Sequence, residues 1–406
     1  MNSKTYCRLP FKQITVSPTG RMQICCVSEH NFTYKSDKRH INEFKNVDEW
    51  FHGNYMNNIR KSMLEGKPLK ECAGCYKVEK NGIQSLRQWQ NKTYPSNDPT
   101  KATLEGLNIK FGNKCNLKCK MCFPYASSEL WKEWQELGWN LNDPHKGGSW
   151  KYYDSYYYED YDWPRKKENF DKLKAMAKYC NWLHFTGGEP MINPKFLEYL
   201  KFCVDEDLAK NISLEVVTNC TKIHPKFLRL AKNFKHIQLR ISIDGLGSTY
   251  DYIRYPGNYN IVEKNFMLYH EWFKENKPND SLAYNFCLSI FNLHDLTNFI
   301  EKFSPLCLNE SGAITNMWDP SFMLHTMLRK DYLEKEIQKL IQLDQNTNNI
   351  LTKQTIWNIL QELKKSDDVD NNERWKLLNE FVIKQDQLRK IHIKNYIPHL
   401  AKFFNY

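Results

Sequence analysis

Hydrophobic and polar positions follow two different patterns along the chain. Residues 1–90 hold short strand-like runs separated by turns, and within QITVSPTGRMQIC the residues Pro18, Thr19 and Gly20 predict a hairpin turn. A helical pattern follows at 47–64. After the polar linker NKTYPSNDPTKA, strand-like runs alternate with helical ones. This second pattern predicts a parallel sheet covered by helices.

Six runs after the linker have the character of buried strands. They are residues 107–111, 182–185, 213–218, 237–243, 284–290 and 313–318. Six successive β/α units predict an incomplete α/β barrel. Beyond residue 320 the chain is charged and helical, with an Asn-rich break at 345–349 and a last helical stretch before Pro398.

An aromatic and acidic segment interrupts this order at residues 139–164, after a helical pattern at 127–138. It is too polar for a core and too long for a tight connection, so it is interpreted as a loop insertion. Its Trp and Tyr side chains offer large contact area at little entropic cost, which favours a substrate-contacting lid at the mouth of the barrel. If the segment emerges at the opposite face, it is only a solvated loop.

The composition indicates a globular protein of 406 residues, 41% of them hydrophobic. The sequence has no apolar run of about 20 residues and no signal-peptide core at its start, so a cytoplasmic protein without membrane contact is expected. In a reducing compartment the 13 cysteines are not expected to form a disulfide framework, and clustered cysteines suggest a metal site. Five of them, Cys180, Cys203, Cys220, Cys287 and Cys307, are scattered.

The net charge of +11 is confined to the first part of the chain. Residues 1–120 hold 21 Lys and Arg against 10 Asp and Glu, and the rest holds 37 of each, since 58 − 21 and 47 − 10 both equal 37. A basic region can attract nucleic acid or an acidic peptide. Thiolates on a metal cluster there would cancel part of this charge.

Three cysteines stand close together directly after the first strand of the predicted barrel. In FGNKCNLKCKMCF, Cys115, Cys119 and Cys122 form a CxxxCxxC pattern with no fourth cysteine nearby. Three thiolates on a four-iron cubane leave one iron open for another ligand, whereas structural zinc takes four protein ligands. A zinc knuckle with a distant fourth ligand is the alternative.

With the downstream motifs, this pattern resembles the radical S-adenosylmethionine (SAM) superfamily over residues 107 to about 292. The resemblance implies a [4Fe–4S] cluster that binds SAM and cuts it reductively to a 5′-deoxyadenosyl radical. It also assigns SAM contacts, mostly at strand ends where barrels place their sites. These contacts are Met121, where the family often has an aromatic residue, and Gly187, Gly188, Glu189, Thr218, Asn219, Ser242, Asp244 and Arg254.

A second group of cysteines lies upstream of the barrel. Cys7, Cys25, Cys72 and Cys75, with Gly20 in the hairpin, resemble the SPASM/Twitch type of auxiliary-cluster module, although that module usually follows the barrel. The resemblance implies one auxiliary [4Fe–4S] cluster. A zinc site with the same four thiolates remains an alternative, and Cys26 could replace Cys25 as a ligand.

The expected architecture is α/β: a partial (β/α)6 radical SAM barrel at residues 104–320, preceded by a small Cys-rich Twitch-like α+β module at 1–95 and followed by a helical extension at 321–406. Family members with such modules often modify peptides or proteins, so a peptide or protein substrate is expected. A one-electron reductant such as a flavodoxin or ferredoxin would supply the electron. Modification of RNA or a nucleotide and a non-enzymatic metal-binding role are the alternatives. No catalytic residue beyond the cofactor ligands is identified.

Overall fold

The computed structural model of the chain describes residues 4–28, 39–80, 82, 84–94, 98, 100–137, 161–317, 320–363 and 372–404. The chain divides into two compact units, each made from segments that are not contiguous in sequence. The first unit consists of Met1–Asn113, Tyr158–Glu215 and Arg229–His236. The second unit consists of Lys114–Tyr157, Val216–Leu228 and Ile237–Tyr406.

The first unit contains four neighbouring strands in the order β2-β1-β3-β4. β1 (Gln13–Val16) pairs antiparallel with β2 (Met22–Gln23), while β1, β3 (Gly106–Ile109) and β4 (Trp182–Phe185) are parallel. Every residue of β1 and β3 is buried, as expected for parallel strands covered on both faces. β1 therefore shares a sheet with β3, the first predicted strand of the barrel. The predicted N-terminal module ends at residue 95 and the predicted barrel begins at 104, and both positions fall inside this one unit.

The predicted hairpin between β1 and β2 is confirmed. The Gly20 N–H donates to the Ser17 carbonyl at 3.0 Å, and Gly20 has a φ of +78°, which side chains with a Cβ rarely adopt. A Cβ on Gly20 would lie 2.6 Å from Nε2 of His40 and 2.9 Å from the ring of Trp163. The turn thus needs glycine both for its backbone angle and for the space that two packed side chains occupy.

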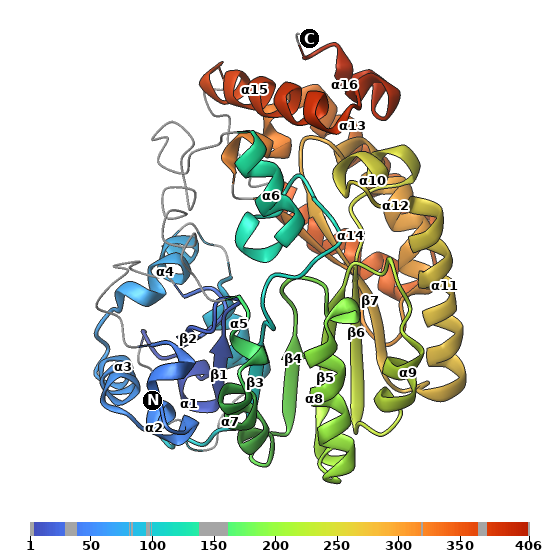
Figure 1. Ribbon diagram of the computed structural model, residues 1–406. Helices are drawn as coiled ribbons and strands as arrows, with labels where there is room; N and C mark the ends of the chain where they lie inside the picture. Colours follow the sequence, from blue (N-terminus) through green and yellow to red (C-terminus); the bar gives the residue numbers. More distant parts are fainter. Residues whose placement is uncertain are drawn as a thin grey trace. The chain divides into compact units, whose positions relative to one another are not determined.

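Helices cover the first unit (Figure 1). They are α1 (Leu9–Lys12), α2 (Val47–Phe51), α3 (Asn54–Leu64), α4 (Ala73–Lys80), α5 (Leu86–Thr93), α7 (Lys167–Ala177) and α8 (Pro194–Asp205). The single helix predicted at 47–64 is divided into α2 and α3, because Gly53 takes an extended conformation, with ψ of 167°, as the N-cap of α3. The side chain of Asn57 then donates to the free His52 carbonyl at 2.7 Å.

Most of the predicted insertion at 139–164, and with it most of the segment predicted to form a lid, lies outside the described residues. The described end of the segment belongs to the core. Trp163 is fully buried, its indole N–H donates to the Pro18 carbonyl at 3.0 Å, and its ring stacks on Phe111 at 6.2 Å between centroids. Trp163 is therefore a core residue of the first unit and no part of an exposed aromatic surface.

The second unit contains the parallel strands β7 (Ser281–Leu288) and β8 (Ala313–Asn316) and all but the first residue of β6 (His236–Ser242). β5 (Ser213–Thr218) and α9 (Pro225–Ala231) contribute residues to both units. Helix α11 packs against β7, and α13 packs against α12 and α14 (Figure 1). The helices wholly within this unit are α6 (Ser128–Glu136), α10 (Gly247–Ile253), α11 (Tyr259–Asn276), α12 (Leu296–Phe303), α13 (Lys330–Asn346), α14 (Ile350–Leu363), α15 (Asn372–Arg389) and α16 (Pro398–Ala401).

The predicted α/β class with parallel strands is confirmed. All six predicted core strands are present as β3 to β8, with ends that differ by a few residues. The break predicted at 345–349 separates α13 from α14. No helix in the described part of the chain combines the length and apolar character needed to span a bilayer. That the N-terminal region forms a Twitch-like module stays a prediction.

Candidate functional site

The three-cysteine loop folds back onto the start of α6 in the second unit. Ser127 caps α6 by accepting from the Leu130 N–H at 3.2 Å, and its hydroxyl donates to the Leu117 carbonyl at 2.7 Å. Between the last two cysteines, the Cys122 N–H donates to the Cys119 carbonyl at 3.0 Å and closes a turn. The loop is thus held by its own turn and by a helix cap.

The residues after α10 hold the same loop from another side. The Lys118 N–H donates to the Tyr255 carbonyl at 2.6 Å, and the Lys120 N–H donates to the Ile253 carbonyl at 2.9 Å. Arg254 lies between these two acceptors in sequence. The backbone around Cys119 and the residue Arg254 are therefore fixed to each other by two hydrogen bonds.

Polar side chains reach two of the three thiols. Arg254 Nη1 lies 3.9 Å from the sulfur of Cys119, and Asn219 Nδ2 lies 4.0 Å from the sulfur of Cys115. Asn219 also donates to Oδ1 of Asn116 at 3.0 Å. Both Arg254 and Asn219 were expected from the sequence to contact SAM, and the structure brings both beside the cysteine loop.

Asp244 holds Arg254 in place. Its carboxylate is fully buried, with Oδ2 2.6 Å from Arg254 Nε and Oδ1 2.6 Å from the Cys287 backbone N–H. Burial lowers the pKa of Arg254, but its neighbours, Asp244 first among them, raise it by more, so the guanidinium stays charged. The described contacts of Asp244 thus position a cation beside Cys119, and its expected ribose contact stays a prediction.

We expect Asp244→Ala to destabilise the protein by about 3–5 kcal/mol, because it leaves the Arg254 cation buried without its partner. The free energy of unfolding from urea titration measures this loss. The double variant Asp244→Ala with Arg254→Met should lose clearly less than the sum of the two single variants. A loss below about 1 kcal/mol for Asp244→Ala would mean that the pair behaves like an exposed one.

Burial disfavours ionisation of two thiols of the loop, those of Cys119 and Cys122. Burial raises the pKa of Cys119, against the lowering effect of Arg254. Burial also raises the pKa of Cys122, and Cys119 and Cys115 raise it further. Such thiols become thiolates when a metal supplies the positive charge, so loading of this site would release protons.

The other residues expected to bind SAM fall in both units. Met121 and Ser242 are partly exposed residues of the second unit, where Thr218 is buried and accepts from the Cys220 N–H at 3.1 Å. Gly187, Gly188 and Glu189 belong to the first unit. The two glycines have φ values of 78° and 59°, and a Cβ on Gly187 would lie 2.7 Å from the side chain of Lys110.

Glu189 is a buried carboxylate that caps the short turn after these glycines. Its Oε1 accepts from the Met191 N–H at 2.9 Å. The glycine conformations and this cap together shape the strand-end loop that the GGEP sequence predicted.

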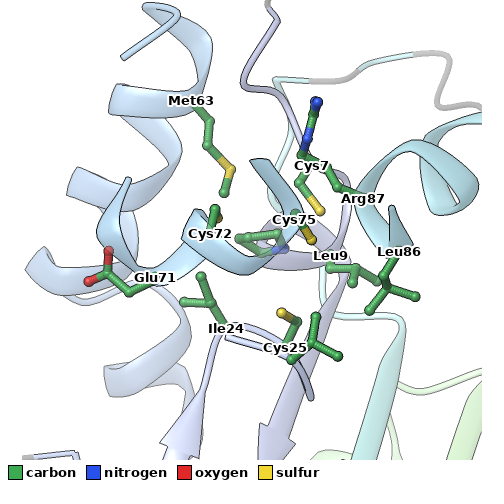
Figure 2. Close-up of a pocket in the computed structure, with 12 residues that line it drawn as sticks. Cys7, Leu9, Ile24, Cys25, Met63, Glu71, Cys72, Cys75, Leu86 and Arg87 are labelled. Carbon is green, nitrogen blue, oxygen red and sulfur yellow. The ribbon is translucent and has the colours of Figure 1, made fainter. Parts of the chain in front are cut away.

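The second group of cysteines surrounds one pocket in the first unit. Figure 2 shows Cys7, Cys25, Cys72 and Cys75 around it. Cys72 and Cys75 come from one turn where the 3-10 segment Lys70–Cys72 runs into α4, and Cys25 follows β2. Cys26 is exposed and does not line this pocket. The four thiols expected from the sequence are thus brought together from three separate segments.

Helix α5 fixes the first of these segments. The Tyr6 carbonyl, next to Cys7, accepts from Arg87 Nη1 and from Asn91 Nδ2, each at 2.8 Å. Arg87 also lines the pocket and is held by Glu79, with Nε 3.0 Å from Oε1. Sequence reasoning missed Arg87, because a lone arginine on an amphipathic helix carries no local signal.

Burial also disfavours ionisation of three thiols of this pocket. Burial raises the pKa of Cys7 and of Cys72 to about 12, and raises that of Cys25 well above its usual range. If these thiols were ionised, each would be repelled by the negative charge of at least one other thiolate nearby. Deprotonating all of them together requires a strongly positive centre among them.

Neither group of cysteines has the geometry of a single-ion site. Across the ranges that the structure describes, no three His, Cys, Asp or Glu side chains converge closely enough to hold one metal ion. In a structural zinc site every sulfur lies about 2.3 Å from the same zinc. The described cysteines are not arranged around one such point.

Comparison with known proteins agrees with this chemistry. The family model of the radical SAM superfamily matches residues 109–280. The radical SAM cyclopropyl synthase TigE of Paramaledivibacter caminithermalis is 26% identical over 279 residues, which cover 65% of this chain and 51% of that protein. The chain thus spans about half the length of this curated relative.

Solved structures with a similar arrangement include two that hold SAM. SuiB of Streptococcus suis bound to S-adenosylmethionine has a TM-score of 0.37 and 13% identity, covering 75% of this chain and 60% of that chain. The enzyme anSMEcpe with bound AdoMet has a TM-score of 0.33 and 19% identity, covering 57% of this chain and 56% of that chain.

Proposed function

We propose that this chain, which carries a radical SAM superfamily domain at residues 109–280, catalyses the one-electron reductive cleavage of SAM. A [4Fe–4S] cluster supplies the electron in enzymes of this superfamily, and a [4Fe–4S] cluster with SAM is the cofactor set of this domain. SAM and one electron give methionine and a 5′-deoxyadenosyl radical. That radical takes a hydrogen atom from the substrate and becomes 5′-deoxyadenosine.

The observation that carries this proposal is the loop of Cys115, Cys119 and Cys122 with a buried cation beside it. Arg254 lies 3.9 Å from the Cys119 sulfur and is fixed by Asp244 at 2.6 Å. A cation at this point would attract the SAM carboxylate and offset thiolate charge. Asn219 adds a neutral donor near Cys115.

The remaining residues of the site would orient SAM. Ser242 supplies a partly exposed hydroxyl at the end of β6 for the ribose. Glu189 would accept from the SAM amino group with its buried carboxylate, which also caps the turn after the glycines. Gly187 and Gly188 would let the backbone approach the ligand closely.

For the upstream pocket we propose an auxiliary [4Fe–4S] cluster held by Cys7, Cys25, Cys72 and Cys75. The support is that the four thiols line one pocket and that their spacing resembles SPASM/Twitch modules, while a zinc site with the same four thiolates is the alternative. Because Cys25 lines the pocket and Cys26 does not, Cys25 is the better candidate ligand. Such a cluster would bind the substrate or accept the electron left after its oxidation.

The substrate we propose is a peptide or protein. The support is the resemblance of the upstream cysteine spacing to SPASM/Twitch modules, whose members often modify peptides. The one-electron reductant would be a small protein such as a flavodoxin or ferredoxin.

The test is anaerobic reconstitution of the whole chain with iron and sulfide, followed by reduction in the presence of SAM. We expect about eight irons per chain, as two cubanes require, and release of 5′-deoxyadenosine measured by mass spectrometry. Stoichiometric zinc with no bound iron, or iron without SAM cleavage, would contradict the proposal.

A further inference from the structure

A buried charged network connects helix α15 to the cysteine loop of the second unit. Glu133 of α6 accepts from Gln385 Nε2 at 2.9 Å and from Arg389 Nε at 2.8 Å. Asp386 accepts from Tyr252 at 3.0 Å and from the Ile393 N–H at 2.9 Å. These contacts join α15 to α6, which are labelled in Figure 1, and to α10.

Two contacts of this network fall on the loop between Cys115 and Cys122. Arg389 Nη2 donates to the Lys118 carbonyl at 2.7 Å. The Lys120 ammonium lies 3.3 Å from Asp386 Oδ1, 3.3 Å from Gln385 Oε1 and 4.0 Å from the centre of the Tyr252 ring. α15 therefore holds both the backbone and a side chain of this loop.

The core of the network is excluded from water. The side chains of Lys120, Asp386 and Glu133 are fully buried, and that of Arg389 is 1% exposed. Two buried cations thus face two buried anions, and a third cation, the partly exposed Lys118 ammonium, lies 3.7 Å from Glu133 Oε2. Removing one member leaves a buried charge uncompensated, whereas removing an opposite pair keeps the balance.

The network reaches the residue on either side of Cys119. Lys118 and Lys120 also donate their N–H groups to the Tyr255 and Ile253 carbonyls, which flank Arg254. Cys119 is thus fixed between α15 on one side and the segment that carries Arg254 on the other.

We propose that Asp386 and Arg389 are positioning residues for the cluster loop, and that the balance between Asp386 and Lys120 sets the reduction potential of the cluster bound there. This inference rests on the proposed function. A negative charge near the cluster disfavours its reduced, more negative form, and a positive charge favours it. α15 would therefore act on SAM cleavage without touching SAM.

The test is a double-mutant cycle in the reconstituted full chain, in which the charges of Asp386 and Lys120 are removed singly and together. At acidic pH, Asp386→Asn should shift the midpoint potential of the SAM-responsive cluster to a more positive value, because it removes a buried negative charge while Lys120 stays protonated. Acidic pH is needed because burial lowers the pKa of Lys120 to about 8 against the raising effect of Asp386, and the variant loses that effect. Lys120→Met should shift it to a more negative value, and the double variant should return close to wild type. Redox titration followed by electron paramagnetic resonance measures these shifts. We expect each single variant to lose SAM cleavage by about tenfold to a hundredfold.

Matched controls lie on the exposed side of the same helix. Glu380 and Lys384 form a pair with side chains 44% exposed, so Glu380→Gln and Lys384→Met make the same charge changes on exposed side chains outside the buried network. Both should keep the wild-type potential and cleavage rate. If Asp386→Asn does not fold, Lys120→Met tests the inference alone through its shift of opposite sign.

The outcomes separate this inference from the proposed function. Wild-type protein without an iron–sulfur signal that responds to SAM would overturn both. A wild-type signal with unchanged potentials in Asp386→Asn and Lys120→Met, whatever their unfolding temperatures, would overturn only the role of α15. Shifts of the same sign in both single variants would also overturn it.

Discussion

Single replacement of Cys115, Cys119 or Cys122 by alanine is expected to abolish release of 5′-deoxyadenosine, to below about one hundredth of the wild-type rate. All three thiolates are needed, because each binds one iron of the cubane and the fourth iron stays open for SAM. Cys119 carries a second role, because its sulfur is the one that Arg254 approaches. The rate is measured by mass spectrometry on anaerobically reduced protein.

Cys307→Ser is the matched control for this prediction. Cys307 is a buried thiol of the same unit, and its sulfur donates to the Phe303 carbonyl at 3.6 Å, a contact that a hydroxyl can keep. This variant should cleave SAM like the wild type. Retained cleavage in any of the three alanine variants would show that the cluster has other ligands.

Replacing Cys72 and Cys75 together by alanine is expected to lower the iron content from about eight to about four per chain while SAM cleavage continues. The reason is that these thiols line a pocket of the first unit, whereas the three-cysteine loop belongs to the second. Cleavage without the auxiliary cluster should be uncoupled from substrate turnover. Iron and 5′-deoxyadenosine are measured on the same preparation.

Two serine variants sharpen this second prediction. Cys25→Ser should lose the same iron, because Cys25 lines the pocket, while Cys26→Ser should keep about eight irons. Full iron in the Cys72 and Cys75 variant, or zinc in place of the missing iron, would remove the auxiliary [4Fe–4S] assignment.

Local patterns in the sequence predicted the strands and the chemistry of the loop. The β1–β2 hairpin followed from a turn sequence with glycine at the position that takes a φ of +78°. Family motifs that come after apolar runs predicted that strands end just before Glu189, Asn219 and Asp244. In each case the signal lies within a few residues of the feature that it predicts.

Features that depend on distant residues were not predictable in this way. Lys120 and Asp386 are separated by 266 positions, and their pairing depends on how α15 packs. Asp244 resembled a ligand contact in the sequence, yet both its oxygens have partners from other segments, Arg254 and Cys287. The extended conformation of Gly53, which ends one helix before the next begins, was also missed, because a single glycine within an apolar pattern is compatible with a continuous helix.

The packing of Trp163 against the hairpin turn limits how the aromatic segment can be engineered. A loop graft or deletion that removes residues 161–164 would take away the indole that fills the space above Gly20 and the carbonyl of Tyr161 that lies 2.6 Å from the Cβ position of Gly112. Asn169 would also lose the Trp163 carbonyl, which it contacts at 3.0 Å. Chimeric loops should therefore be joined before Tyr161, so that any loss of activity reports on the exchanged segment and not on a damaged core.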